Sequence, residues 1–255
     1  MVQESAISPA DDWNSHWANY DQVTAINPAQ RWRFHSIERT IKSFGLGHQL
    51  SITDLGCGQG DLLSYLHDQF PESNLVGIEP SEVGCGLSKL KTPSAKILEI
   101  DITTSEDANT MIKSSNVIIC TEVLEHLDHP ELLMSSLAKK MSQNSTLLLS
   151  VPGGPRSKFD KHIGHRRHFD RKVLKKLLKD SGFSEIDVYS SGFPGFNLYK
   201  ICTILMGKRL IKTAVSADSS PIAHYISRLF LILMTYSRNR SRFGWQLFAV
   251  CKIGK

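Results

Sequence analysis

Short apolar runs alternate with amphipathic stretches along most of the chain. The runs have few polar side chains at either alternating set of positions, which is typical of strands buried in a parallel sheet with helices on both faces. The expected strands are 50–55, 75–79, 96–100, 117–120, 146–151, 186–189 and 244–253. The expected helices are 28–44, 61–70, 81–90, 130–141 and 171–180. The pattern therefore predicts an α/β fold with a seven-stranded, mostly parallel sheet.

Two apolar segments interrupt this alternation before the last expected strand. They cover 198–205 and 222–236, and the polar link Ser216–Pro221 separates them. We expect a helical insertion over 197–243, for which four roles stay open. It can cap an apolar acceptor, contact an anionic membrane through 222–242, form a dimer interface, or be an ordinary buried helix pair. Both segments are shorter than the roughly 20 apolar residues that a spanning helix needs.

The first expected strand leads directly into a glycine-rich turn, Asp54-Leu-Gly-Cys-Gly-Gln-Gly60. A dinucleotide site uses the spacing GxGxxG, whereas this turn has GxGxG. Asp61 places an anion where a pyrophosphate would lie, which favours a zwitterionic ligand with a cationic sulfonium instead. Asp54 adds a negative charge for an amino group. Structural alternatives stay open, because Asp54 can accept from turn amides, Asp61 can complement the helix dipole, and Gly60 can serve packing alone.

Further acids follow the next three expected strands, at the edge where open α/β sheets bind ligands. Glu79 ends the second strand and can accept both hydroxyl groups of a ribose. Asp101 follows the third, where its carboxylate can accept an adenine amine while Ile102 packs on the ring. Glu122 begins the segment EVLEH after the fourth strand.

These motifs, in this order, resemble those of the class I S-adenosylmethionine-dependent methyltransferases. The branch they resemble most methylates small-molecule and lipid-type acceptors and includes the ubiquinone-biosynthesis type. The resemblance covers residues 30–190 and implies a Rossmann-like fold with S-adenosylmethionine as the cofactor. It also implies an N-terminal lid segment, 1–29, in front of a methyltransferase domain, 30–255.

The resemblance also gives the expected roles of individual residues. Gly56 and Gly58 would line the methionine part of the cofactor, Glu79 would hold the ribose, and Asp101 with Ile102 the adenine. The predicted cofactor-binding residues are Asp54, Gly56, Gly58, Glu79, Asp101, Ile102 and Glu122. Arg31 and Arg33 are candidates for the cofactor carboxylate. The trio Trp13, Trp17 and Tyr20 would close the lid or simply pack.

The stretch KHIGHRRHFDRK, 161–172, is expected to be a loop on the cofactor side, forming one wall of an acceptor pocket. His165 and His168 are the candidate catalytic bases, and Arg166 and Arg167 the candidate residues for gripping an anionic acceptor. A solvated basic loop is the alternative. His126 is expected to orient the chain beyond the strand, and Asp170 to cap the next helix.

Composition limits the classes of partner and the cellular compartment that we expect. The net charge of +5 is too small to argue for a nucleic acid, so none is expected. Five cysteines without a CxxC pattern indicate a reducing cytosol, with neither disulfides nor a metal site. The first residues lack a signal-peptide pattern, so we expect a cytoplasmic protein, with membrane association through 222–242 left open.

The expected function is methyl transfer to a small-molecule or lipid-linked acceptor, with oxygen as the expected acceptor atom. Two alternatives stay open. One is a non-catalytic protein that binds S-adenosylmethionine, which the intact set of glycines and acids disfavours. The other is an NAD-dependent oxidoreductase, which the GxGxG spacing disfavours.

Overall fold

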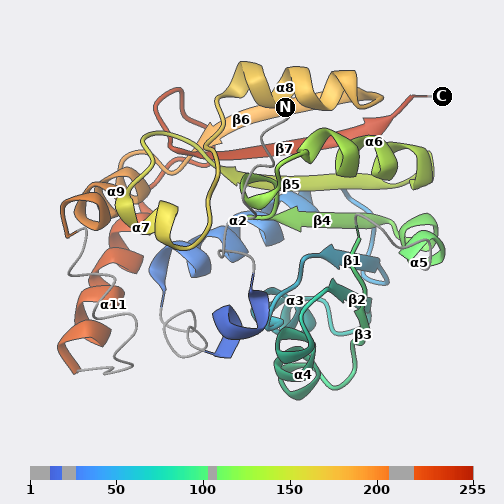
Figure 1. The fold of residues 1–255 in the computed structure, drawn as a ribbon, viewed down its shortest axis with the longest axis horizontal. Helices are drawn as coiled ribbons and strands as arrows, with labels where there is room; N and C mark the ends of the chain where they lie inside the picture. The colour runs from blue at the N-terminus through green and yellow to red at the C-terminus, as the bar shows by residue number, and fades with distance from the viewer. Residues whose placement is uncertain (1–11, 19–26, 103–107, 207–220, 255) are drawn as a thin grey trace, which may run out of the picture.

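The computed structural model describes residues 12–18, 27–102, 108–206 and 221–254, with the backbone alone at 221–224 and 226. Its centre is a seven-stranded sheet of order β3-β2-β1-β4-β5-β7-β6 (Figure 1). All pairs from β3 to β5 are parallel, while β7 runs antiparallel to both of its neighbours. The predicted seven-stranded, mostly parallel sheet is confirmed. The strands are β1 (Ser51–Leu55), β2 (Asn74–Glu79), β3 (Lys96–Glu99), β4 (Val117–Thr121), β5 (Thr146–Pro152), β6 (Phe183–Ser191) and β7 (Gln246–Ile253).

Helices cover both faces of the sheet, as predicted. The helices are α2 (Pro28–Ser43), α3 (Asp61–Gln69), α4 (Glu82–Lys91), α5 (Ala108–Ser114), η2 (Leu124–His126), α6 (Pro130–Lys140), α7 (Lys158–His162), α8 (Arg171–Asp180), α9 (Gly195–Met206) and α11 (Pro221–Thr235). One face packs against α5, α6 and α8, and the other against α2, α3 and α4. Strand β4 shows the consequence: Ile118 and Cys120 are buried on the first face, and Val117 and Ile119 on the second.

The main departure from the predicted elements lies after β5. The expected loop at 161–172 begins inside a short helix, α7, so the prediction of a continuous loop is wrong. The Ser157 hydroxyl accepts from the Asp160 amide, and the Asp160 carboxylate accepts from the Ser157 amide. This capping box satisfies two amides that would otherwise lack partners, which stabilises a helix of only five residues. Asp170 caps α8, as predicted.

Helices α9 and α11 lie between β6 and β7, which places a helical insertion where the sequence predicts one. Figure 1 shows both helices at one end of the sheet. Helix α11 packs on α2 and on α9. Both helices expose large apolar side chains, among them Leu198, Leu205, Tyr225 and Ile232. None of the described helices has the length and apolarity to cross a bilayer. Most of the link Ser216–Pro221 lies outside the described residues.

Candidate active site

A cavity of about 960 Å³ lies at the carboxyl ends of β1, β2, β4 and β5. Its lining begins at the glycine turn, passes the acids that follow β2, β3 and β4, and ends at residues from α7, α9 and α11. Ligand pockets usually measure roughly 300–1,000 Å³, so this volume has room for a nucleoside cofactor and an acceptor together.

The glycine turn is held in backbone conformations that disfavour other residues. Gly56, Gly58 and Gly60 have φ values of 71°, 54° and 80°. A Cβ on Gly56 would lie 2.6 Å from Val123 Cγ2, and one on Gly58 would lie 2.4 Å from the Trp17 ring. The turn is therefore closely covered by the segment after β4 and by the helix at residues 13–18.

Glu79 lies under this cover with both carboxylate oxygens engaged. Oε2 accepts from the Gly58 amide at 2.9 Å, while Oε1 accepts from the Ser81 amide at 3.2 Å and from Trp17 Nε1 at 3.3 Å. The side chain is buried, and this burial raises the pKa of the carboxyl above its usual range. Bidentate binding of ribose hydroxyls would use the position that Trp17 Nε1 takes. The lid role of residues 1–29 stays a prediction, and residues 1–11 and 19–26, which include Tyr20, lie outside the described part.

Asp54 is the clearest sign that the cavity fits a cationic ligand. Its side chain is buried at the cavity wall, and Oδ1 has no hydrogen-bond partner among the described residues. Burial, with a smaller contribution from Glu79, raises the pKa of Asp54 to about 7. The thiols of Cys57 and Cys120 lie nearby and stay neutral, because burial raises the pKa of both. An ammonium group would supply the missing partner and the missing positive charge.

We expect cofactor binding to depend on pH through Asp54. The carboxyl binds an ammonium group as the anion, so a pKa of about 7 means that binding tightens as pH rises toward neutrality. Calorimetric titration with S-adenosylhomocysteine should show an affinity that falls up to about tenfold per pH unit between pH 7 and 6. Asp54→Asn should bind more weakly and lose this dependence. A wild-type affinity that stays flat across this range would contradict the role of Asp54.

The remaining cofactor residues meet at the same cavity. Asp101 and Ile102 line it after β3, as the resemblance implies. Asp61 lines it too, but its carboxylate bonds to Lys91 Nζ at 2.7 Å, Gln59 Nε2 at 2.7 Å and Gln30 Nε2 at 3.1 Å. These bonds give Asp61 a structural role in joining α2, α3 and α4.

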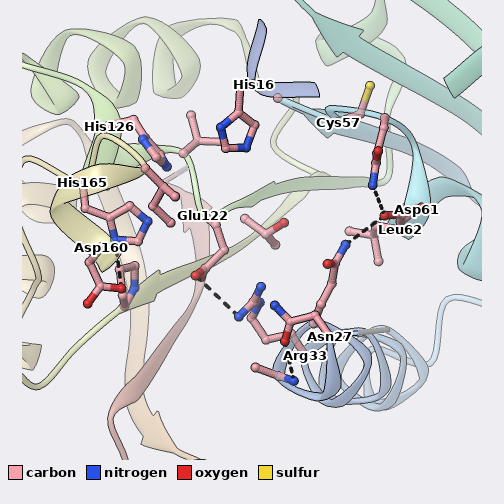
Figure 2. Close-up of a pocket in the computed structure, with 18 of the residues that line it drawn as sticks. His16, Asn27, Arg33, Cys57, Asp61, Leu62, Glu122, His126, Asp160 and His165 are labelled. Atoms are coloured by element: carbon pink, nitrogen blue, oxygen red, sulfur yellow. Dashed lines mark hydrogen bonds and ion pairs between the residues drawn. The ribbon is translucent and has the colours of Figure 1, made fainter. Parts of the chain in front are cut away.

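Glu122 adopts a strained backbone at the end of β4. Its φ of 56° is the one positive value among the described residues other than glycine. Its Oε1 accepts from Ser150 Oγ at 3.0 Å and from Gln246 Nε2 at 2.8 Å, and its Oε2 lies 3.6 Å from Arg33 Nη1. Figure 2 shows Glu122 and Arg33 joined across the cavity. Arg33 lines the cavity, whereas Arg31 is exposed outside it.

The basic segment divides between the cavity and its support. His165 and Arg166 line the cavity, whereas His168 and Arg167 do not. Arg166 Nη1 pairs with Asp128 Oδ2 at 2.9 Å, and Arg167 Nη2 donates to the Asp128 carbonyl at 2.8 Å. The segment is thus bound to the loop before α6. The catalytic role of His165 and His168 and the acceptor role of the two arginines stay predictions.

Several lining residues were not singled out from the sequence. Lys200 of α9 pairs with Asp160 of α7 at 2.5 Å, and both line the cavity. Gln246 of β7 reaches Glu122 from the opposite end of the chain. No local motif marks these residues, because only the folding of the last hundred or so residues across the sheet edge brings them here.

A family model described as "Methyltransferase domain" matches residues 29–188. The chain belongs to this family. The match begins at α2 and ends in β6, so it includes the glycine turn and every acid of the cavity described above. It confirms the prediction of a class I S-adenosylmethionine-dependent methyltransferase, with S-adenosylmethionine as the cofactor. The alternative of an NAD-dependent oxidoreductase is set aside.

Two curated relatives show the range of the sequence likeness. Trans-aconitate 2-methyltransferase of Yersinia pestis (strain Pestoides F) is 31% identical over 167 residues, which are 63% of this chain and 62% of the relative. (S)-Tetrahydroprotoberberine N-methyltransferase of Eschscholzia californica is 23% identical over 120 residues, which are 46% and 30% of the two chains. The match thus spans less than two thirds of either relative.

Solved methyltransferase structures share the fold. The plantazolicin methyltransferase BpumL aligns with a TM-score of 0.61 and 15% identity, covering 96% of this chain and 95% of its own. A possible histamine N-methyltransferase from Thermotoga maritima aligns with a TM-score of 0.59 and 13% identity, covering 94% and 97%. A likeness this wide shows that the chain shares the fold of these structures over nearly its whole length.

Proposed function

We propose that the protein transfers a methyl group from S-adenosylmethionine to an oxygen of a small-molecule or lipid-linked acceptor. The observation that carries the proposal is the continuity of the cavity. At one end Asp54 and Glu79 offer buried carboxylates to the cofactor, and at the other end lie His165, Arg166 and apolar side chains of α7 to α11. Bound there, S-adenosylmethionine would supply an already activated methyl group, so the main task of the chain is to orient the acceptor.

The acceptor end combines charge with apolar surface. Arg33, Arg166 and Lys200 line it, each paired with an acid, and Phe159, Ile163, Tyr199 and Phe230 provide apolar walls. This combination supports an acceptor with an anionic group and an apolar body. The relative from Yersinia pestis is named for trans-aconitate, so that acid is the first acceptor to test. Membrane contact through 222–242 stays a prediction, and sedimentation with anionic vesicles tests it.

The two candidate bases are not poised for proton transfer at neutral pH. Burial, with the neighbouring imidazole of His126, holds the pKa of His165 well below its usual range. Burial likewise lowers the pKa of His168, which does not line the cavity. A general base works best with a pKa near the working pH, so orientation rather than strong base catalysis is the expected contribution of this chain.

We expect label from methyl-tritiated S-adenosylmethionine to appear in a product when trans-aconitate or a lipid extract is supplied. Partition between organic and aqueous phases separates a lipid-type product from a small polar one, and alkaline release of label as methanol identifies a methyl ester. Arg166→Gln should raise the acceptor KM about tenfold or more through loss of one charge-assisted contact, with cofactor affinity unchanged. Cofactor binding without transfer to any acceptor in the extract would favour the non-catalytic alternative.

A further inference from the structure

We propose that Glu125, His126 and His165 form a binding site for a divalent first-row transition ion, such as Zn²⁺, with an open position facing the cavity. Their ligand atoms all lie within 4.8 Å of one another. The site departs from the expectation, drawn from the sequence, that the chain has no metal site. The metal site rests on the proposed function in one respect only: the open coordination position is placed at the acceptor end of the cavity.

Glu125 is a buried carboxylate without a hydrogen-bond partner. The residue has no exposed surface, and neither Oε1 nor Oε2 has a hydrogen-bond partner among the described residues. The two cationic side chains whose charge acts on Glu125 already have acidic partners, since Arg33 pairs with Glu122 and Lys200 with Asp160. A buried carboxylate needs a proton or a cation, and native proteins rarely leave such a group unsatisfied.

Two imidazoles face this carboxylate. His165 Nε2 lies 3.9 Å from Glu125 Oε1, and the His126 and His165 rings lie 4.7 Å apart, edge to face. His126 Nδ1 is buried and has no hydrogen-bond partner among the described residues. A neutral imidazole has one ring nitrogen with a lone pair, and such a nitrogen is a common ligand of divalent transition ions. Figure 2 shows the two rings side by side at one end of the cavity.

The backbone fixes these three side chains from two distant segments. Glu125 and His126 lie in η2, directly after the turn at Glu122. The Arg166 amide donates to the Glu125 carbonyl at 2.8 Å, which ties the loop after α7 to η2. This bond sets His165 beside its two partners without any help from an ion, so the site is largely formed in advance.

The donor set suits a tetrahedral ion bound by nitrogen and oxygen. The three ligand atoms lie within 4.8 Å of one another, and those of Glu125 and His165 are 3.9 Å apart. Two ligands bound to Zn²⁺ at about 2.0–2.1 Å lie roughly 3.4 Å apart, so an ion would draw these atoms closer by up to about 1.4 Å. Two histidines with one carboxylate are a set used by catalytic zinc sites, which keep a fourth position open. His126 and His165 line the cavity, which is where that position would lie.

Two neighbouring side chains already orient His165. Its Nδ1 lies 3.4 Å from His168 Nε2 and 4.0 Å from Asp160 Oδ1, which leaves Nε2 facing Glu125. His168 Nδ1 is in turn bonded to the Gly154 carbonyl at 3.1 Å. Asp160, His165 and His168 also lie close enough to bind an ion together. Lys200 and the capping box already satisfy Asp160, so this second group is the weaker candidate.

The test is Co²⁺ binding to the full chain after treatment with a chelator and dialysis. We expect one Co²⁺ per chain, with saturable visible absorption that Zn²⁺ displaces. Glu125→Gln and His126→Gln should each weaken binding at least about 100-fold, because loss of a side chain that only orients a metal ligand already costs roughly 10–100-fold. The matched controls are Glu131→Gln and His129→Gln on the exposed start of α6, which should bind as the wild type does.

Each outcome decides between the site and its alternatives. No saturable Co²⁺ signal in the wild type would overturn the proposal and leave Glu125 as a protonated carboxyl. Binding that survives Glu125→Gln but is lost in His168→Gln would assign the ion to the Asp160 group instead. Calorimetry with S-adenosylhomocysteine on each variant shows, independently of metal binding, whether the variant is folded and keeps its cofactor site. A chain that binds this cofactor but no Co²⁺ contradicts the metal site alone. If Glu125→Gln does not fold, His126→Gln decides.

Discussion

Replacing Glu79 by glutamine is expected to weaken the binding of S-adenosylmethionine about 100-fold or more. The physical reason is the charge that Glu79 brings to two hydroxyl groups. Hydrogen bonds to a charged group contribute about 1.5–3 kcal/mol each, and 1.4 kcal/mol corresponds to about a tenfold change in affinity. An amide offers one oxygen acceptor where the carboxylate offers two, so one ribose hydroxyl loses its partner and the other loses the charge.

The measurement is calorimetric titration of wild type and variant with S-adenosylmethionine and S-adenosylhomocysteine. Glutamine keeps the size of the side chain, and its one oxygen can still accept from either the Gly58 or the Ser81 amide, while its NH₂ group faces the other. Glu82→Gln is the matched control, since Glu82 is exposed in the first turn of α4, three residues along the chain. Unaltered cofactor affinity in Glu79→Gln would remove Glu79 from the ribose site.

The helix at residues 13–18 affects the result of the same experiment. Trp17 Nε1 donates to the oxygen of Glu79 that a ribose hydroxyl would use, and the Trp17 ring covers Gly58. Cofactor binding therefore requires this tryptophan to shift. A glutamine at position 79 also weakens the hold on Trp17, so part of the cost of moving the helix disappears. The measured loss of affinity is the difference between these two effects. For this reason the expected value, about 100-fold, is taken from the low end of the range that two lost charged hydrogen bonds would give.

The sheet and the cofactor end of the cavity could be predicted because their signals are local. Uniformly apolar runs identify strands buried on both faces, and each acid at the end of such a run or just after it must lie at the same edge of a parallel sheet. The positions of Asp54, Glu79 and Asp101 at this edge could therefore be predicted from their places in the sequence relative to the strands. All three line the cavity.

The acceptor end could not be predicted in the same way, because contacts between distant segments form it. The meeting of His126 with His165 depends on the bond between the Arg166 amide and the Glu125 carbonyl, which nothing near either histidine encodes. The short helix α7 was missed because five residues are too few for a helical period to show. Its signal was the Ser157–Asp160 pair, a capping box with aspartate in place of the commoner glutamate.

A pair of glycine replacements is expected to have opposite effects on stability. Gly60→Ala should lower the free energy of unfolding by about 2–4 kcal/mol, the sum of a positive φ and of overpacking. The residue has a φ of 80° at the start of α3, and a Cβ there would lie 2.8 Å from Ser88 Cα and 2.3 Å from Ser88 Oγ. Ser88 is buried inside α4, so its backbone cannot yield without moving that helix.

Gly86→Ala provides the matched control in the facing helix. A Cβ at Gly86 meets no heavy atom within 4 Å, and the residue lies within α4. Alanine there should raise the free energy of unfolding by about 0.5–1 kcal/mol, because glycine is the poorer helix former. Urea unfolding of both variants, with equal dependence on denaturant concentration, measures the two changes. The contrast also identifies the role of the third glycine of the turn. If Gly60→Ala keeps wild-type stability but loses cofactor affinity, Gly60 contacts the ligand and the packing explanation is wrong.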